Sequence, residues 1–361
     1  MNPGTAPAVR QTRKTLMYPF LTVHTLTALP THNLNRDENG APKQVTQGGV
    51  TRARLSSQSL KRAARIGFER ECEQATESVR TKVSATVIAD RVAELRGPMS
   101  KGEHSALTKS IVARVNSLTR TSDAESKKDT LVWLSATEIE TAARAFAAGN
   151  DAAIVNTQNT DSLAIAAFGR MFTADPRLSI PSAVSVGDAV TTHAATIELD
   201  WFAAVDDRSE HGGAGQLGFA MSTSGVYYRT FTIDRAQLAQ NFQEPLDSAI
   251  AEVQLRSLVR HLTLDLPTGR RAGTAAQTLP AFILAEEQTH RVNYDFQEPV
   301  TATREGGFLT PSIAALEKKA TEARTFDPDL FGSHLLSGTV TGQGIQPFPK
   351  YLDFVMEFLR R

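Results

Sequence analysis

The sequence predicts an α+β protein in which one helical insertion interrupts a ferredoxin-like sheet. The major predicted elements run strand, helix, helical insertion, strand, strand, helix, strand, which is the β-α-β-β-α-β order of ferredoxin-like domains. The insertion, residues 71–190, is mostly polar and Ala-rich, with breaks at Gly97-Pro98 and Gly149-Asn150. A glycine-rich stretch, residues 206–224, separates two adjacent strands, and its length predicts a long protruding loop rather than an ordinary hairpin turn.

The N-terminal elements are predicted from residue periodicity. Alternation of apolar and polar side chains indicates a strand over Phe20–Leu26 and a shorter one over residues 50–55, "VTRARL". A helix is predicted to follow over residues 56–71, with Ser56 or Ser57 as its cap. Its buried stripe is expected to consist of Leu60, Ala64, Gly67 and Phe68.

The C-terminal half supplies the rest of the predicted sheet. Strands are expected over residues 196–205, 225–233 and 280–286, and amphipathic helices over 246–264 and 351–361. In the first of these strands the apolar side chains point to one side and Glu198 and Asp200 to the other. Residues 19–70 and 191–361 are therefore expected to form one domain, with residues 71–190 as a helical insertion.

Composition excludes several classes of protein. The 361 residues are 41% hydrophobic and 22% charged, as is ordinary for a globular protein in water. No apolar run approaches the ~20 residues of a membrane span, and the first nineteen residues lack the apolar core of a signal peptide. The single Cys72 cannot form an internal disulfide, which fits a reducing cytoplasm, and it is interpreted as a half-buried helix residue. We therefore expect a cytoplasmic protein.

The formal net charge of zero conceals an uneven distribution. Residues 1–70 hold 11 basic and 3 acidic side chains, so the remainder carries a compensating excess of acid. No acid occurs between Glu38 and Glu69. This asymmetry suits a protein with one anion-binding face, and also one whose copies stack with positive side against negative side.

Cations gather where the strand 50–55 meets the following helix. Gln58, Lys61 and Arg65 share one helix face, with Arg62 beside it, and the helix N-terminus offers unpaired N–H groups. Arg52 and Arg54, two apart on a strand, are expected to project from one side toward this junction. For the helix alone a solvated amphipathic face is the better interpretation. The strand arginines and the acid-free window instead favour a site for phosphodiester groups.

The glycine-rich stretch 206–224 allows three interpretations. "GAGQLG", Gly213 to Gly218, has the spelling of a dinucleotide-binding turn, but a loop and a strand follow it where that motif requires a helix. A protruding loop with Leu217, Phe219 and Met221 could insert between bases. A surface loop without a special role is equally compatible with the sequence.

The sequence gives little support for a metal site or a catalytic centre. Asp206 and Asp207 lie near His211, but glycine-rich surroundings offer no fixed ligand geometry. His24 and His193 are isolated from any suitable nucleophile. We expect no cofactor, no metal and no catalytic residue.

Several blocks resemble one known family. "NLNRDENGAPK" followed by "GGVTRARLSSQSLKRAAR" is similar to the N-terminal signature of the CasC family, the backbone subunit of the type I-E CRISPR Cascade surveillance complex. "FGRM", "DWFAAVDD", "LGFAMSTSGVYYR" and "GGFLTPS" occur in the family's order. The resemblance extends from about Phe20 to about Ser312. Residues 1–18 lie outside it and are expected to form a basic arm.

The resemblance implies a hand-like fold and a non-catalytic role. The fold would have an RNA-recognition-type palm, helical fingers from residues 71–190 and a thumb from the loop 206–224. Several copies would stack head to tail along a CRISPR guide RNA and present its bases to a target DNA strand, together with other Cascade subunits. The implied RNA contacts join those already predicted from the cations, and together they are Arg36, Arg52, Arg54, Ser56, Gln58, Lys61, Arg62, Arg65, Arg170, Met171 and Leu217.

Within this family, Met171 matches a residue that packs where one base is turned out. Leu217 belongs to the element that covers this displaced base in the neighbouring stretch. The sequence shows no aromatic consensus for stacking bases on the sheet. Two alternatives stay open. One is an enzyme that binds a nucleotide cofactor through residues 212–218, and the other is an RNA-binding protein outside CRISPR systems.

Overall fold

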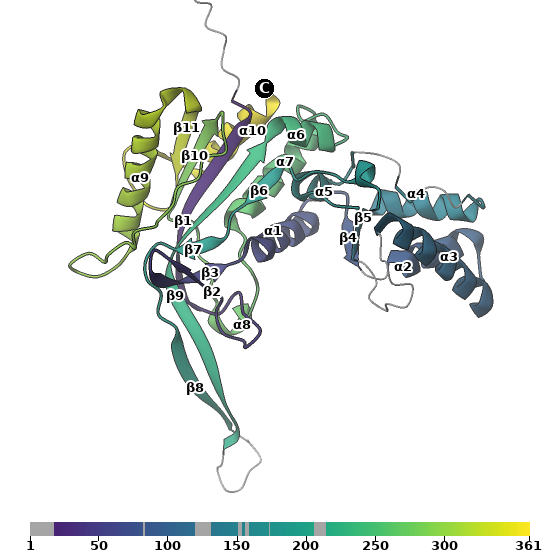
Figure 1. Ribbon diagram of the computed structural model, residues 1–361, viewed down its shortest axis with the longest axis horizontal. Coiled ribbons are helices and arrows are strands. Elements are labelled where there is room, and N and C mark those ends of the chain that lie inside the picture. Colours follow the sequence, from purple (N-terminus) through teal and green to yellow (C-terminus); the bar gives the residue numbers. More distant parts are fainter. Residues whose placement is uncertain are drawn as a thin grey trace, which may run out of the picture.

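The computed structural model describes residues 18–81, 84–119, 131–150, 154–155, 159–172, 174–205 and 214–361. Figure 1 shows a central sheet with helices packed on it, a helical lobe to one side and a long two-stranded hairpin that projects from the bottom of the sheet. We call these three parts the palm, the fingers and the thumb.

The described strands of the palm and thumb form one ten-stranded sheet. All pairings are antiparallel except that between β11 and β12. The main path runs in the order β12 (Ile345–Gln346), β11 (Phe331–Ser337), β10 (Phe282–Gln288), β1 (Phe20–His32), β9 (Ala214–Asp234), β7 (Ala189–Thr191), β3 (Val50–Leu55) and β2 (Gln44–Gln47), and β6 (Val184–Val186) and β8 (Glu198–Val205) also pair with β9.

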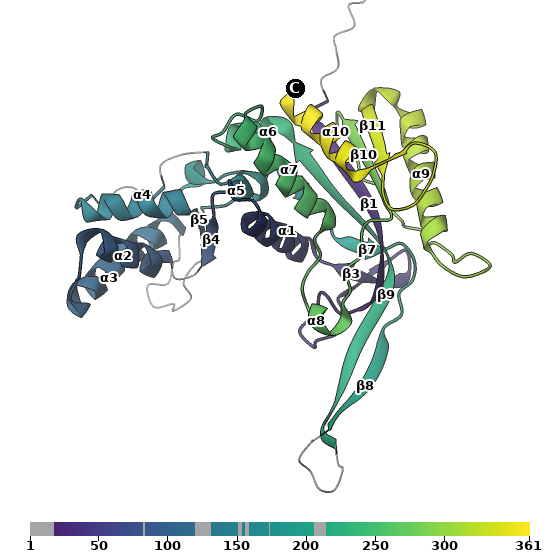
Figure 2. The same cartoon turned by 180° about the vertical axis from the view of Figure 1, so that it is seen from behind.

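Both faces of the sheet are covered around the upper part of β1, whose side chains alternate between two apolar cores. Leu21 and Val23 pack toward α1 (Ser57–Glu71), α7 (Ala249–Leu264) and α10 (Phe348–Arg360), which lie together on one face (Figure 2). Leu26 points to the other face and packs with Leu316 of α9 (Leu309–Phe326). This two-sided burial fixes the register of β1, since a shift by one residue would exchange the two faces.

Helix α1 has the buried stripe that the sequence predicts, namely Leu60, Ala64, Gly67 and Phe68. Gly67 is required by a close approach, since a Cβ there would lie 2.1 Å from Asp265 Oδ2 and 2.5 Å from His261 Nδ1. With this face held against α7, the side of α1 that carries Gln58, Lys61 and Arg62 is left outside the core.

The fingers have their own hydrophobic core. Helices α2 (Ser84–Arg96), α3 (Lys101–Thr119) and α4 (Ala136–Ala147) bury Ile88, Ile111 and Phe146 together. A separate two-stranded sheet, β4 (Ser78–Thr81) with β5 (Val132–Ser135), lies between α1 and these helices (Figure 1).

Short elements complete the described chain. They are α5 (Leu163–Phe168), η1 (Pro176–Leu178), α6 (Arg235–Asn241), α8 (Arg271–Thr274) and η2 (Pro328–Leu330). Among the described helices, none combines the length and the apolar character that crossing a membrane requires.

The structure corrects three expectations. Residues 214–224 are not a loop but the first half of the 21-residue strand β9, which pairs with β8 as a hairpin; the remainder of the expected loop, 206–213, lies outside the described residues. The expected helical insertion 71–190 ends too late, because the palm sheet resumes at β6, before residue 191, and α5 packs in the palm core.

The third correction concerns Cys72, which was expected to be a half-buried helix residue. Cys72 caps the C-terminal end of α1 and is buried. The expected basic arm falls almost wholly on residues 1–17, outside the described chain.

Candidate nucleic-acid interface

The first turn of α1 is fixed by two side chains from neighbouring segments. Asn35 Oδ1 accepts from the Ser56 N–H at 2.8 Å and from the Ser59 hydroxyl at 3.3 Å. Asp188 Oδ1 accepts from the Ser57 N–H at 2.7 Å. The prediction of a free helix N-terminus for a phosphate is therefore wrong at Ser57, where a carboxylate of the chain takes that place. Ser56 is itself buried and serves to anchor the turn.

Arg52 is a second correction, because its side chain is 0% exposed. Its guanidinium donates to the backbone carbonyls of Gln47 (3.1 Å), Thr191 (2.8 Å) and Phe296. Burial also lowers its pKa from the ordinary value. The alternation of β3 places Arg52 and Arg54 on one side of the strand, but the segment around Phe296 covers the first of them. Arg52 supports the sheet and is not open to an external strand.

Two further arginines meet acids that the acid-free window did not reveal. Arg54 Nη1 lies 3.4 Å from Asp188 Oδ2, and its side chain remains 31% exposed. Arg65 Nη1 donates to Glu69 Oε2 at 2.7 Å, with both side chains mostly buried. The expected absence of competing carboxylates is therefore wrong. Asp188 lies far away in sequence, and Glu69 is the first acid after the window, four residues beyond Arg65.

Lys61 and Arg62 are the cations of α1 that no acid neutralises within the described part of the chain. Lys61 is half-buried, and this burial lowers the pKa of its ammonium from the ordinary value. Arg62 and Gln58 are exposed, and no hydrogen bond or ion pair to a described residue engages their side chains. A charge that is partly desolvated and unpaired is strongly attracted to an anion. These residues are the part of the predicted site on α1 that is free to bind.

Arg170 is not free. It is 7% exposed, and its guanidinium forms two hydrogen bonds to the Glu138 carboxylate, at 2.5 and 2.7 Å. Its neighbour Met171 is 77% exposed. The turn before them needs Gly169, which has φ of 75° and where a Cβ would lie 2.7 Å from both Ile180 O and Ser182 N. The predicted RNA contact of Arg170 is corrected to an internal ion pair, while Met171 stays open to a ligand.

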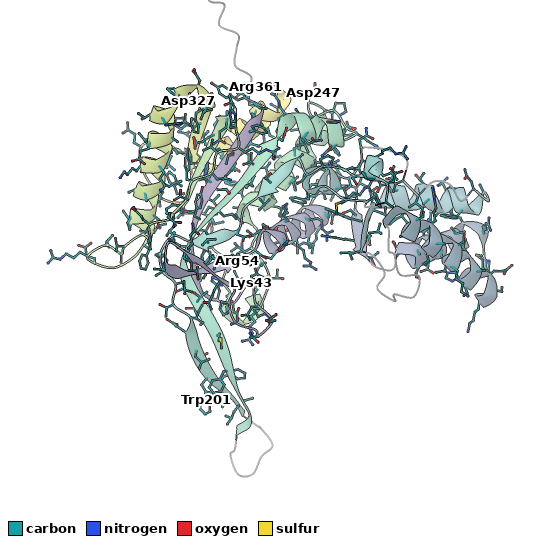
Figure 3. The ribbon with its side chains drawn as sticks, viewed as in Figure 1. Lys43, Arg54, Trp201, Asp247, Asp327 and Arg361 are labelled. Atoms are coloured by element: carbon teal, nitrogen blue, oxygen red, sulfur yellow. The ribbon has the colours of Figure 1, made fainter. Side chains whose placement is uncertain are left out.

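Cations that the sequence argument did not single out lie on the loop of Arg36 and on a turn joined to that loop. The Arg36 side chain is exposed in the loop between β1 and β2. Lys43 follows this loop, and Figure 3 shows it beside Arg54, whose N–H donates to the Lys43 carbonyl at 2.8 Å. The turn with Arg270 and Arg271 joins the same loop through the hydrogen bond from Gly269 N to Leu34 O, 3.1 Å. The dipeptide "RR" at 270–271 was visible in the sequence, but the contact of its turn with the loop of Arg36 depends on the tertiary fold.

The thumb hairpin presents one apolar face to solvent. Register pairs Leu199 with Met221 and Trp201 with Phe219, and Leu217 continues the same face. Trp201 is 58% and Phe219 64% exposed (Figure 3 labels Trp201). The alternation predicted for this strand is confirmed, but the apolar side is not buried against the palm. Exposed aromatic side chains on a projecting element are suited to stacking on bases.

The described part of the glycine motif "GAGQLG" lies in the hairpin, in the strand that pairs with β8. Gly218 lies opposite Phe202 in the register, and a Cβ on Gly218 would lie 2.5 Å from the Phe202 ring. The described part of "GAGQLG" is thus a strand paired with β8, without the helix that a dinucleotide-binding turn needs. Within the described residues, no three His, Cys, Asp or Glu side chains gather as a metal site would require.

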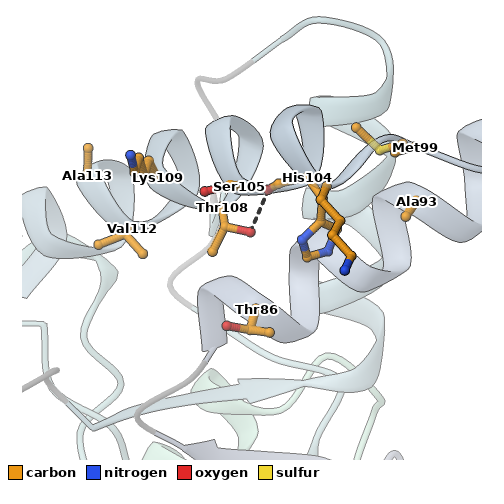
Figure 4. Close-up of a pocket in the computed structure, with 10 residues that line it drawn as sticks. Thr86, Ala93, Met99, His104, Ser105, Thr108, Lys109, Val112 and Ala113 are labelled. Atoms are coloured by element: carbon orange, nitrogen blue, oxygen red, sulfur yellow. Dashed lines mark hydrogen bonds between the residues drawn. The ribbon is translucent and has the colours of Figure 1, made fainter.

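A groove of about 800 Å³ lies in the fingers between α2 and α3. Figure 4 shows Met99, His104, Lys109 and Val112 along it. His104 Nε2 is 3.0 Å from Asp90 Oδ1. The groove belongs to a different lobe from α1 and shares no lining residue with the interface described above.

Comparisons with known proteins agree with this architecture. The model of the Cas_CT1975 family, described as "CT1975-like protein", matches residues 21–346. No curated protein matches the sequence. A chain of a "CRISPR RNA-guided surveillance complex, pre-nicking" has TM-score 0.75 and 22% identity over 94% of this chain and 100% of that one. A chain of a "CRISPR RNA-guided surveillance complex" has TM-score 0.67 and 20% identity over 94% and 99%. At such identities the solved structures establish a shared fold.

Proposed function

Because the chain belongs to the CT1975-like protein family, we propose that it is a non-catalytic RNA-binding backbone subunit of a Cascade-type CRISPR surveillance complex. The observation that carries this proposal is the outer side of α1, where Lys61 and Arg62 lie beside the exposed Gln58 and have no acid partner among the described residues. Cations that contact phosphates hold a strand without reading its bases. A subunit that must accept any guide sequence needs this kind of contact.

The remaining open cations extend the proposed contact along the palm. Arg36, Lys43 and Arg54 lie on the segments that lead into α1, and Arg54 shares its charge with Asp188. Met171 would then pack where one base is turned out of the strand, and the apolar face of the thumb would cover the displaced base in the neighbouring stretch. The matched solved structures, whose printed names describe RNA-guided complexes, support this assignment.

The finer assignment is to type I-E and the CasC family, on the resemblance of "NLNRDENGAPK" and "GGVTRARLSSQSLKRAAR". The central strand order β10-β1-β9-β7, with α1 after β1 and α7 between β9 and β10, supports a ferredoxin-like palm of the RNA-recognition type. A projecting hairpin and an offset helical lobe suit head-to-tail stacking of copies along a guide, which would leave the bases open to target DNA. Other Cascade subunits would complete the complex.

The test is a double charge reversal, Lys61→Glu with Arg62→Glu, followed by co-purification from cells that express a guide RNA. We expect the variant to lose the bound RNA, since two repulsive carboxylates replace two phosphate-binding cations. The absorbance ratio at 260 and 280 nm and sequencing of the bound nucleic acid measure the loss. The same sequencing separates a CRISPR guide from other cellular RNA.

The matched control is Lys318→Glu with Lys350→Glu, which changes the net charge equally at exposed positions away from α1. RNA retained by the α1 variant, or lost equally from both variants, would contradict the proposal. The rival interpretation, an enzyme with a nucleotide cofactor, predicts instead that a mononucleotide or dinucleotide raises the melting temperature of the RNA-free chain.

A further inference from the structure

Two arginines that the resemblance assigns to RNA, Arg65 and Arg170, lie at opposite ends of one internal network. The network begins on α1, runs through the two-stranded sheet β4–β5, and ends at the start of α4. It therefore crosses from the palm to the fingers at the point where the two lobes meet (Figure 1).

At the palm end, one carboxylate organises the contacts. Glu69 accepts from Arg65 Nη1 at 2.7 Å and from the Ser78 hydroxyl. Ser78 Oγ in turn accepts from Trp133 Nε1 at 2.7 Å, and the Arg65 guanidinium lies over the Trp133 ring, 5.6 Å from its centroid. The side chains of Arg65 and Glu69 are only 16% and 11% exposed. Arg65 also donates to the Ser78 carbonyl at 3.4 Å, so it contacts three residues of its own chain, and a carboxylate already neutralises its charge.

At the fingers end, the arrangement is similar. Arg170 donates to the backbone carbonyl of Trp133 at 3.3 Å and to both oxygens of Glu138. Glu138 also accepts from the Ser135 N–H at 2.9 Å, and Ser135 Oγ accepts from the Glu138 N–H at 3.1 Å, so this carboxylate belongs to the capping box of α4. Register places Ser135 opposite Ser78 and Trp133 opposite Arg80. Trp133 is therefore the residue that both arginines touch.

We infer that Arg65 and Arg170 are positioning residues that hold the fingers against the palm, and that neither contacts the bound strand. The inference rests on the proposed function for the strand itself, and it assigns the phosphate contacts on α1 to Lys61 and Arg62. Through this network the exposed Met171, which directly follows Arg170, keeps a fixed place relative to the outer side of α1.

Salt dependence of binding separates the two roles. Each phosphate contact with a single strand adds about 0.7 to the slope of log K against log salt, because a condensed counterion is released. For Arg65→Gln we expect the affinity of the full chain for a labelled single-stranded RNA to fall about tenfold with an unchanged slope. Arg62→Gln, its matched control on the same helix, is expected to lower both the affinity and the slope. A slope reduced by Arg65→Gln as much as by Arg62→Gln would overturn the inference.

A second variant, Glu69→Gln, is expected to change the affinity for RNA in opposite directions under the two roles of Arg65. If Arg65 positions the fingers, loss of its carboxylate partner weakens binding as Arg65→Gln does. If Arg65 were a phosphate contact, removal of the competing carboxylate would leave binding unchanged or strengthen it, and this result would also refute the inference. If instead neither Lys61→Gln nor Arg62→Gln alters affinity or slope, the proposed site on α1 fails, whatever Arg65 does.

Tryptophan emission reports the position of the fingers independently of RNA. The chain has two tryptophans, so Trp201→Phe leaves Trp133 as the single emitter. In that background, Arg65→Gln and Glu69→Gln are expected to shift the Trp133 emission to the red. The indole ring loses the guanidinium that lies over it in the first variant, and the Ser78 hydroxyl that accepts from it is less fixed in the second. The far-ultraviolet circular dichroism should be retained in both. An unchanged emission from both variants would contradict the positioning role.

Discussion

At the residue scale, the position of an arginine relative to the core decides what its charge does. Arg52 and Arg62 are ten residues apart in the same basic stretch, yet the first donates to three backbone carbonyls, two of them buried, and the second faces solvent. A buried guanidinium without an acid is stable here because carbonyl oxygens accept its hydrogen bonds. The same chemistry at the surface leaves the guanidinium free for a phosphate.

Replacement of Arg52 tests this distinction. Arg52→Met leaves the carbonyls of Gln47, Thr191 and Phe296 without this donor, and each of the two buried ones, those of Thr191 and Phe296, costs about 1–3 kcal/mol. We expect the free energy of unfolding to fall by about 3 kcal/mol or more in urea titrations. Arg54→Met, the control on the same strand, removes only a partly exposed ion pair and should cost about 1 kcal/mol or less. A smaller loss for Arg52→Met than for Arg54→Met would contradict the assigned role.

At the scale of elements, the thumb hairpin has an apolar face and an acidic face. Leu199, Trp201 and Phe219 lie on one face, whereas Glu198 and Asp200 lie on the other. A hairpin that only supported the palm would have its apolar face covered, and this face is exposed. Exposed apolar patches of this kind commonly mark binding surfaces. The acidic face would be repelled by a phosphate backbone, so the apolar face is the one suited to a strand.

The hairpin prediction concerns Trp201 and Phe219. Replacing both by Ser is expected to weaken binding of a single-stranded RNA, since stacking of a base on an aromatic side chain contributes about 1–3 kcal/mol. The melting temperature should change little, because both rings are exposed. Phe202→Ser, on the opposite face, is the matched control and should bind RNA as the wild-type chain does. An equal loss of RNA affinity in both variants would contradict the assignment of RNA binding to the apolar face.

At the scale of the whole molecule, local patterns predict elements better than contacts. The strand 50–55, the buried stripe of α1 and the alternation of β8 are all visible in periodicity, and the structure has each of them. The continuation of β9 to 21 residues was hidden, because its first half is glycine-rich and gains its strand structure by pairing with β8. Local sequence cannot report a partner strand.

The candidate site also has residues that local sequence features predict and residues whose contacts only the tertiary fold reveals. Helix spacing, a local feature, placed Gln58, Lys61 and Arg62 together on the outer side of α1, and the resemblance pointed to Met171, which is exposed. Arg52, Arg65 and Arg170 are occupied by other parts of the chain. Asp188 reaches Arg54 across 134 positions and Glu138 reaches Arg170 across 32, and no sequence spacing indicates such pairs.

The central claim is that the cations near the amino end bind the sugar-phosphate strand whatever its sequence. The most direct test measures the affinity of the purified chain for two single-stranded RNAs of equal length and unrelated sequence, over a series of salt concentrations. We predict nearly equal affinities and a steep linear fall of log K with log salt, about 0.7 for each phosphate bound. Affinities that do not change with salt concentration, or that differ more than tenfold between the two sequences, would contradict the claim.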